Sequence, residues 1–350
     1  MGTHSTLATG NRQLTGPDVR SSRGGGAAGI FNSVVAGFAV ATAWEIGALD
    51  ELNDAGRLSV PAFCTSHDLH LASVRSLFAA LASAGVVVRA GDTVSIGPEF
   101  ADVYQNKAFF HWLTIGCGEL FAAMPRIVRN QNRTGEYYQR DAAAIAFACR
   151  EINARSFDPV FWQAMQAVDF PFSTVADLGC GSGGRLAQIA DRFPQVRGIG
   201  VDISADALHA AETFVDQAGF GDRLRFIEAD VLALTADERF EDVELLTSFM
   251  MGHDFWPREQ CVTVLRRLRQ AFPNVRRFLL GDTARTQGIP DEDKPVFTLA
   301  FETAHDLMGV DLPTLADWAG VFEEGGWRCV NVREVRTPAD SVIYELEPLR

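Results

Sequence analysis

The chain has 350 residues, 47% of them hydrophobic and 22% charged, and this globular composition excludes a mostly disordered or collagen-like protein. Its 31 Lys and Arg against 45 Asp and Glu give a formal net charge of −14, which argues against nucleic-acid binding because that function needs a basic face. No apolar run approaches the ~20 residues that span a bilayer, so we expect no membrane contact. The six cysteines have no CxxC spacing, which favours reduced thiols in a cytoplasmic protein over a disulfide framework.

The first hundred residues divide into a tail and a small domain. Residues 1 to 27 are rich in Gly, Ser and Thr and lack an apolar stretch, so we expect a flexible tail that is neither a signal peptide nor an anchor. Residues 28 to 100 follow the order helix, helix, helix, hairpin, which predicts a mainly α-helical winged-helix domain. We expect a first helix over 30–50, a second that starts at Val60-Pro61 and then Ser66, and a third over 71–84. The two strands of the hairpin are expected over 86–89 and 93–96.

The remainder predicts a helical region followed by an α/β domain. Residues 101 to 170 look helical and rich in aromatics, and we expect them to link the two domains and to cover part of a substrate cavity. From residue 171 to 350, short apolar strands alternate with helical stretches, which predicts a doubly wound parallel sheet with a C-terminal antiparallel hairpin at its edge. The expected strands are 174–178, 198–201, 224–227, 244–249 and 277–280, with the hairpin over 327–335 and 341–346.

A glycine-rich loop follows the first strand of the predicted sheet. The sequence runs Asp177-Leu178-Gly179-Cys180-Gly181-Ser182-Gly183 before a helix. Glycines at this place let the backbone turn sharply and let a ligand approach it closely. A lone glycine pattern is weak evidence, because dinucleotide-binding folds place GxGxxG at the same point.

Acidic residues end the next two strands. Asp202 ends the second strand, where a carboxylate can grip a ribose diol, and Asp230 ends the third. Together with the glycine loop, this pattern resembles the class I methyltransferases that use S-adenosylmethionine. The resemblance implies that Asp177, Gly179, Gly181 and Gly183 hold the methionine moiety, Asp202 the ribose hydroxyls, and Asp230 with Val231 the adenine. An NAD-binding domain is the alternative, and the glycine spacing, Asp230 and the terminal hairpin count against it.

Two histidine–aspartate pairs stand out in the second half of the chain. His253 and Asp254 follow the fourth strand, whose end faces the reacting group in a doubly wound sheet. His305 lies in the segment that commonly covers this fold. A histidine at such a place can be a general base or a metal ligand, or it can simply pack. Two histidines and one carboxylate can also form a facial set on non-haem iron that leaves open positions for a chelating substrate.

A second resemblance is carried by five segments: Ala43–Asp50, Phe110–Leu113, Tyr138–Asp141, Met250–Glu259 and His305–Val310. Through them, from about residue 30 to its end, the chain closely resembles the α-keto acid C-methyltransferases of bacterial peptide-antibiotic pathways. This resemblance implies S-adenosylmethionine as donor, iron held by His253, Asp254 and His305, and Arg140 as the clamp on the substrate carboxylate. It also implies a homodimer formed through the winged-helix domain.

Several alternatives stay open at this point. In a small-molecule O-methyltransferase, His253 would be the general base and His305 incidental. From the residues alone, an ion pair of Arg140 with Asp141 or Glu136 is the favoured interpretation. A DNA-binding regulator is disfavoured, because residues 28 to 100 hold three Arg against seven acidic residues. The sequence leaves open whether an aromatic or a branched apolar side chain is accepted, and whether a histidine is the base.

Overall fold

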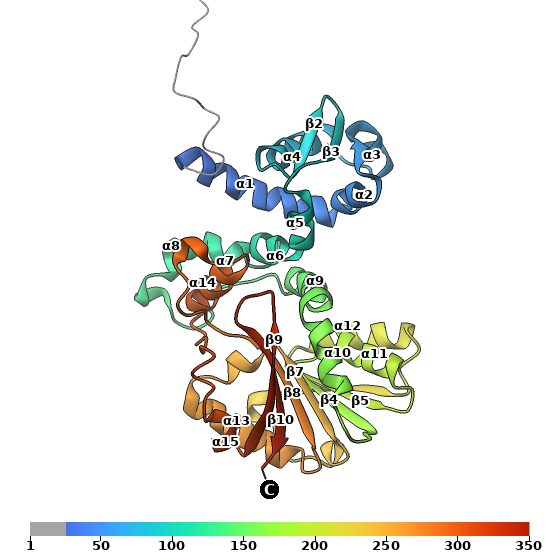
Figure 1. Cartoon of the computed structure of the whole chain (residues 1–350), viewed down its shortest axis with the longest axis vertical. Helices are drawn as coiled ribbons and strands as arrows, with labels where there is room; N and C mark the ends of the chain where they lie inside the picture. The colour runs from blue at the N-terminus through green and yellow to red at the C-terminus, as the bar shows by residue number, and fades with distance from the viewer. Residues whose placement is uncertain (1–25, 350) are drawn as a thin grey trace, which may run out of the picture. The chain divides into compact units, whose positions relative to one another are not determined.

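The computed structural model describes residues 26 to 349, and the chain forms two compact units that meet in sequence between Gln105 and Asn106 (Figure 1). The predicted tail lies outside the described residues except at positions 26 and 27, which already belong to helix α1.

The N-terminal unit is mainly helical with a small sheet. Its three strands form an antiparallel sheet in the order β1-β3-β2. The single helix expected over residues 30 to 50 is wrong, because Gly47 breaks it with a φ of 81°, a left-handed conformation that costs glycine little. The elements are α1 (Gly26–Glu45), α2 (Ala48–Ala55), β1 (Arg57–Ser59), α3 (Val60–Ser66), α4 (Leu71–Ser83), β2 (Val87–Ala90), β3 (Thr93–Ile96) and α5 (Phe100–Gln105).

Helix α1 exposes a run of large apolar side chains. Within the described residues it is the one helix long and apolar enough to cross a membrane by length and composition alone. The expectation that no such stretch exists is therefore corrected, although an apolar helix of a soluble protein passes the same test. The exposed side chains are Ile30, Phe31, Val34, Val35 and Phe38.

The C-terminal unit begins with short helices, two of which are π-helical. Such turns are rare and often occur at functional sites. The elements are α6 (Lys107–His111), the π-helix η1 (Trp112–Gly116), α7 (Gly118–Ala122), α8 (Met124–Ile127), η2 (Asn130–Asn132), α9 (Ala142–Ile152), the π-helix η3 (Asn153–Phe157) and α10 (Asp158–Gln166).

A seven-stranded sheet follows, in the order β6-β5-β4-β7-β8-β10-β9. Five strands are parallel, and β10 pairs antiparallel with both β8 and β9, so the predicted doubly wound sheet with a terminal hairpin is confirmed. The strands are β4 (Thr174–Leu178), β5 (Arg197–Asp202), β6 (Leu224–Glu228), β7 (Leu245–Phe249), β8 (Arg277–Thr283), β9 (Trp327–Val335) and β10 (Ser341–Pro348). The helices are α11 (Gly184–Arg192), α12 (Ala205–Gln217), α13 (Arg258–Ala271), α14 (Thr298–Met308) and α15 (Val321–Glu324), with short turns η4 (Val231–Ala233), η5 (Glu238–Phe240), η6 (Gly252–Phe255) and η7 (Asp291–Asp293).

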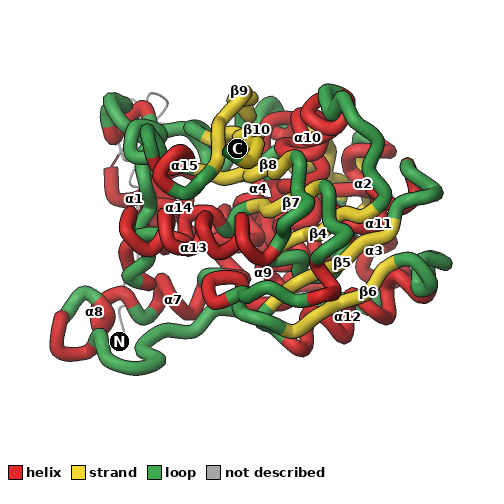
Figure 2. Tube along the Cα trace, turned by 90° about the horizontal axis from the view of Figure 1, so that it is seen from below, coloured by secondary structure: helices red, strands yellow, loops and turns green. Residues whose placement is uncertain are grey.

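Helices cover both faces of this sheet (Figure 2). Successive strand residues alternate between two apolar cores, because side chains in a strand point to opposite faces. Val175 and Leu245 pack with α10, α11 and α12, whereas Ala176 and Leu246 pack with α13 and α15. The two cores leave the carboxyl edge of the parallel strands to the loops that carry the candidate site.

Candidate active site

The loop after β4 contains three glycines with left-handed backbone: φ is 69° at Gly179, 50° at Gly181 and 72° at Gly183. A Cβ on Gly179 would lie 2.6 Å from Sδ of Met251, and one on Gly183 would lie 2.9 Å from Cζ of Phe226. A Cβ on Gly181 would meet nothing within 4 Å. The first and third glycines thus let neighbours pack closely, whereas Gly181 faces open space at the carboxyl edge, where ligands of such sheets bind.

Asp177, at the start of the glycine motif, is a buried carboxylate. Its Oδ1 accepts a hydrogen bond of 2.6 Å from Oγ1 of Thr247 on β7. Burial raises the pKa of Asp177 to about 6, and the nearby positive charge of Arg185 offsets only part of that effect. A cationic ligand beside this carboxylate would favour its ionised form.

Asp202 and Asp230 anchor the neighbouring loops. Asp202 accepts hydrogen bonds from the backbone N–H groups of Gly181 (2.8 Å) and Ser204 (2.9 Å). Oδ1 of Asp230 accepts from the N–H of Leu232 at 2.9 Å. The strands that lead to Asp177, Asp202 and Asp230 are adjacent in the sheet, so the structure brings the three predicted donor-site acids to one edge.

His253 lies in η6, directly after β7, and is buried. Its Nδ1 is 2.8 Å from Oδ1 of Asp282 on β8. Burial opposes the charged form of His253, but the carboxylate of Asp282 outweighs burial and raises the pKa of His253 above its ordinary value. Since a carboxylate accepts the hydrogen bond, Nδ1 carries the proton, and the neutral ring has its lone pair on Nε2.

His305 lies within α14 and is also buried. Its Nδ1 is 2.7 Å from the carbonyl oxygen of Phe301, which can only accept, so Nδ1 again carries the proton. Burial, with the positive charges of His253 and Arg140, lowers the pKa of His305 to about 3. The two imidazole rings meet edge to face with centroids 4.8 Å apart. The structure therefore pairs the two predicted histidines, and in the neutral form of each ring the lone pair is on Nε2.

Arg140 lies near this histidine pair. Its positive charge lowers the pKa of both His253 and His305, and its side chain is exposed. Within residues 26 to 349 it makes no ion pair with a carboxylate, so the ion pair favoured from sequence does not form there. Asp141 instead caps α9, accepting a hydrogen bond of 2.9 Å from the N–H of Ala144. The guanidinium of Arg140 is thus available to an acidic ligand.

Asp254 completes the predicted ligand set only in part. Its side chain is exposed, and in the described part of the chain no group of three His, Cys, Asp or Glu side chains is arranged to hold a metal ion. The donor chemistry of the histidines nevertheless fits a metal, because metal-bound histidines commonly donate their other ring N–H to a carboxylate or a backbone carbonyl. The histidine pair therefore fits a metal, and Asp254, which follows His253 directly in the chain, stays a predicted third ligand.

A cluster of aromatic side chains adjoins His305 through Phe301. Phe301 lies 4.1 Å from its ring and 5.8 Å from the ring of His253, measured between centroids. Phe297 stacks on Phe109 at 4.6 Å and meets Trp112 edge to face at 4.9 Å. The histidine pair therefore lies against an apolar wall.

Asp282 was missed by the sequence analysis. The predicted strand stopped at Leu280, whereas β8 continues to Thr283 and is buried throughout. An acidic residue directly after a buried apolar run was the available signal, the same one that identified Asp177 and Asp202.

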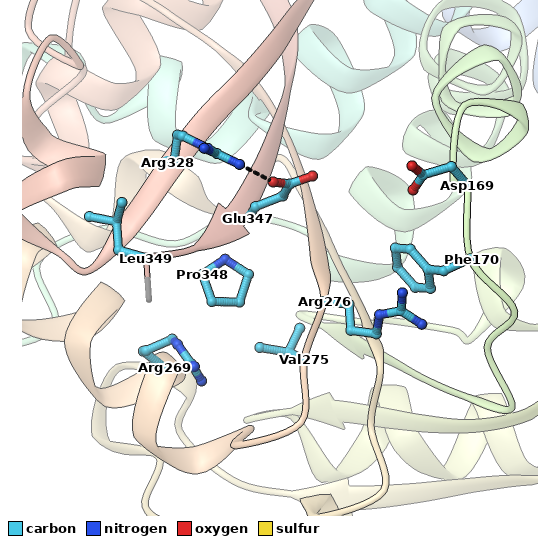
Figure 3. A pocket seen from close by; sticks show the side chains of 9 residues that line it. All are labelled: Asp169, Phe170, Arg269, Val275, Arg276, Arg328, Glu347, Pro348 and Leu349. Carbon is cyan, nitrogen blue, oxygen red and sulfur yellow. Dashed lines mark hydrogen bonds and ion pairs between the residues drawn. The ribbon is translucent and has the colours of Figure 1, made fainter.

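A separate cavity of about 840 Å³ lies at the opposite edge of the sheet (Figure 3). Its wall includes Arg276, next to the first residue of β8, and Glu347, near the end of β10. Arg328 pairs with Glu347 at 2.6 Å, and the guanidinium of Arg276 lies 3.9 Å from the ring of Phe170. Arg269, also in the wall, donates to the carbonyl oxygen of Pro273 at 3.3 Å. None of the predicted site residues lines this cavity.

The seven-stranded sheet and its helices have the class I methyltransferase fold. Comparison with known proteins agrees. Residues 175–273 match a family model described as a methyltransferase domain. The chain is 47% identical over 326 residues to Methyltransferase ungE' of Aspergillus campestris, covering 91% of this chain and 95% of that protein.

A second relative is Indolepyruvate C-methyltransferase of Streptomyces griseus, 30% identical over 325 residues, with 91% of this chain and 94% of that protein covered. The solved structure of PigF with SAH has the same fold, with a TM-score of 0.65 at 18% identity and coverage of 91% of this chain and 98% of that one. The chain therefore belongs to the S-adenosylmethionine-dependent methyltransferases and is an enzyme of that class.

Proposed function

We propose that the enzyme is a metal-dependent C-methyltransferase that moves the methyl group of S-adenosylmethionine to the β-carbon of an α-keto acid. The observation that carries this proposal is the buried pair of His253 and His305, whose neutral rings have their lone pairs on Nε2, near an Arg140 that has no carboxylate partner in the described residues. The name of Indolepyruvate C-methyltransferase, which refers to an α-keto acid, supports it.

The reaction needs a carbon nucleophile. The β-carbon of an α-keto acid becomes nucleophilic only after it loses a proton, which gives an enolate. The enolate carbon then forms a bond to the methyl carbon as the bond between that carbon and the sulfonium sulfur breaks. The products are the β-methylated keto acid, S-adenosylhomocysteine and the proton held by the base.

Each candidate residue has a role in this scheme. Arg140 forks onto the substrate carboxylate and orients it. Asp177, the glycine loop, Asp202 and Asp230 with Val231 hold the donor. His253, Asp254 and His305 would hold the metal, whose Lewis acidity would stabilise the negative charge of the enolate.

The surroundings favour an apolar substrate side chain, either phenylpyruvate-like or 4-methyl-2-oxopentanoate-like. The supporting observation is the aromatic wall formed by Phe297, Phe301 and Trp112 beside His305. The winged-helix interpretation of the N-terminal unit, its role in forming a homodimer and a cytoplasmic location belong to the same proposal. That this unit does not bind nucleic acid is part of the same proposal; Arg75 of α4 is paired with Asp92 at 2.7 Å.

A second candidate is an O-methyltransferase in which His253 is the general base. The hydrogen bond between Asp282 and His253 favours it, because a carboxylate on Nδ1 orients a histidine and strengthens it as a base. That function needs neither His305 nor a metal.

The decisive experiment incubates the full chain with methyl-labelled donor and separate acceptors: phenylpyruvate, 4-methyl-2-oxopentanoate and a panel of phenols. We expect label at the β-carbon of a keto acid, located by NMR, and loss of turnover after treatment with a chelator. Label on oxygen, with chelator-resistant turnover, would instead establish the second candidate.

A further inference from the structure

The C-terminal end of α14 is capped by a segment about 170 residues earlier in the chain. The last carbonyl groups of a helix lack partners within the helix. Here the guanidinium of Arg133 donates to the carbonyl oxygens of Leu307 (3.1 Å) and Asp306 (3.2 Å), and the hydroxyl of Tyr137 donates to the carbonyl oxygen of Met308. The guanidinium of Arg133 also lies over the ring of Tyr137, 4.9 Å from its centroid.

Gly309 makes room for this cap. Its φ is 77°, and a Cβ there would lie 2.8 Å from the hydroxyl oxygen of Tyr137 and 2.9 Å from Nη2 of Arg133. A larger residue would push both side chains away from the end of the helix. The helix terminus and the capping segment thus fit each other closely.

The cap connects two residues of the candidate site, His305 and Arg140. His305 lies one turn before Met308 on α14, and Arg140 lies three residues after Tyr137. Both ends of this short connection are held: Arg126 donates to the carbonyl oxygen of Tyr137 at 2.6 Å, and the N–H of Asp141 donates to the carbonyl oxygen of Gly116 at 2.9 Å. Arg140 therefore lies on a span of backbone fixed on one side to α14 and on the other to the π-helix η1.

We propose that Arg133 and Tyr137 are positioning residues that set the separation between Arg140 and His305, and through it the affinity for the carboxylate end of the substrate. This inference rests on the proposed function, in which Arg140 binds the carboxylate of an α-keto acid. The predicted donor residues lie at the ends of β4, β5 and β6, and none of them belongs to α14 or to the capping segment. We therefore expect the affinity for S-adenosylmethionine to be independent of the cap.

The chain offers a matched pair of variants. Tyr137→Phe removes the hydroxyl that caps α14. Tyr138→Phe removes the neighbouring hydroxyl, for which the structure records no hydrogen bond within residues 26 to 349. The two rings meet edge to face at 5.3 Å, and both variants keep that contact.

The test measures kcat and KM for phenylpyruvate, donor affinity by calorimetry and Tm for the wild type and both variants. We expect KM for phenylpyruvate to rise about tenfold in Tyr137→Phe, as loss of roughly one hydrogen bond predicts. Donor affinity should stay within about twofold, and Tyr138→Phe should match the wild type. Arg133→Lys should recover part of the KM increase seen in Arg133→Ala.

An unchanged KM in Tyr137→Phe, or an equal loss in both tyrosine variants, would overturn the positioning role while leaving the function in place. A wild type that neither binds nor methylates any keto acid would overturn the proposed function, and the positioning role with it.

Discussion

Nδ1 of His253 lies 2.8 Å from Oδ1 of Asp282, and both side chains are buried. Oδ1 of Asp282 also accepts the N–H of Thr283 at 2.9 Å, so the carboxylate is fixed by its own strand. A Cβ on Gly252 would lie 2.7 Å from Oδ2 of Asp282, which explains the glycine next to His253. The orientation of the imidazole is therefore set by β8 as well as by its own loop.

Asp282→Asn tests this orientation. The amide removes the negative charge and can turn its NH₂ group toward Nδ1, so Nε2 of His253 is no longer held as the lone-pair nitrogen. We expect kcat to fall about 10- to 100-fold, the usual effect of losing such a supporting carboxylate. Donor affinity, measured by calorimetry, serves as the control and should be unchanged. A variant with normal kcat would show that Asp282 only fills space.

The two candidate functions diverge at His305. For the metal-dependent enzyme, His305→Ala and Asp254→Ala should each lose bound metal and at least about 100-fold in turnover, because a three-ligand site cannot spare a donor. For the O-methyltransferase only His253→Ala is severe. Elemental analysis of the purified proteins and product quantification separate the two. A metal-free, active wild type, or a His305→Ala variant with full turnover, would exclude the metal-dependent function.

Donor binding should depend on pH through Asp177, whose pKa is raised to about 6 in the free enzyme. The cationic donor favours the ionised carboxylate, so binding near pH 6 releases a proton. Affinity should be flat well above this pKa and fall by up to about tenfold per pH unit below it. Calorimetry in two buffers with different ionisation heats measures the released proton. Asp177→Asn should bind more weakly and without this pH dependence; a wild-type affinity that is flat from pH 5 to 8 would contradict the assignment.

Gly181→Val tests whether the open space beside that glycine holds the donor. The substitution costs about 1–3 kcal/mol because the backbone is left-handed. Gly219→Val, at a glycine with φ of 79° and equally open surroundings, carries the same kind of backbone cost away from the predicted donor residues. We expect lost donor binding in Gly181→Val alone, with similar Tm values for both variants. Equal donor affinity in the two variants would show that the donor does not bind at this loop.

We expect the exposed face of α1 to be buried in a dimer interface. Phe31 is 72% exposed and Ile30 is 70% exposed, and exposed apolar surface of this extent commonly marks an interface. Phe31→Glu should convert a dimer into a monomer at micromolar concentration, as measured by light scattering. Val88→Glu places the same charge at another exposed apolar position of the unit, 52% exposed, and should leave the dimer intact. A monomeric wild type would count against the proposal.

The sequence predicted the sheet well because its signals are local. Apolar runs that end in Asp177, Asp202 and Asp230 indicate the strands and also the edge of the sheet where a ligand would bind. All five predicted parallel strands occur within a few residues of their expected bounds. The sequence could not show that Asp141 would cap α9 and that Arg140 would have no carboxylate partner among residues 26 to 349. The cap of α14 was equally hidden, since Arg133 and Met308 are brought together only by the tertiary fold.

The hydrogen bond from Thr247 to Asp177 also bears on how the sheet assembles. β4 and β7 are apolar on both faces, so a slip of one residue would exchange one apolar contact for another, and hydrophobicity alone specifies their register weakly. Asp177 pairs with Thr247 across the two strands, and Oγ of the next residue, Ser248, donates to the carbonyl oxygen of Leu178 at 3.0 Å. A shifted strand would place Leu246 or Ser248 opposite Asp177 and disrupt both polar contacts, at a cost of about 1–3 kcal/mol for each buried group left unpaired. The carboxylate proposed to meet the donor therefore also selects the correct alignment of the central strands during folding.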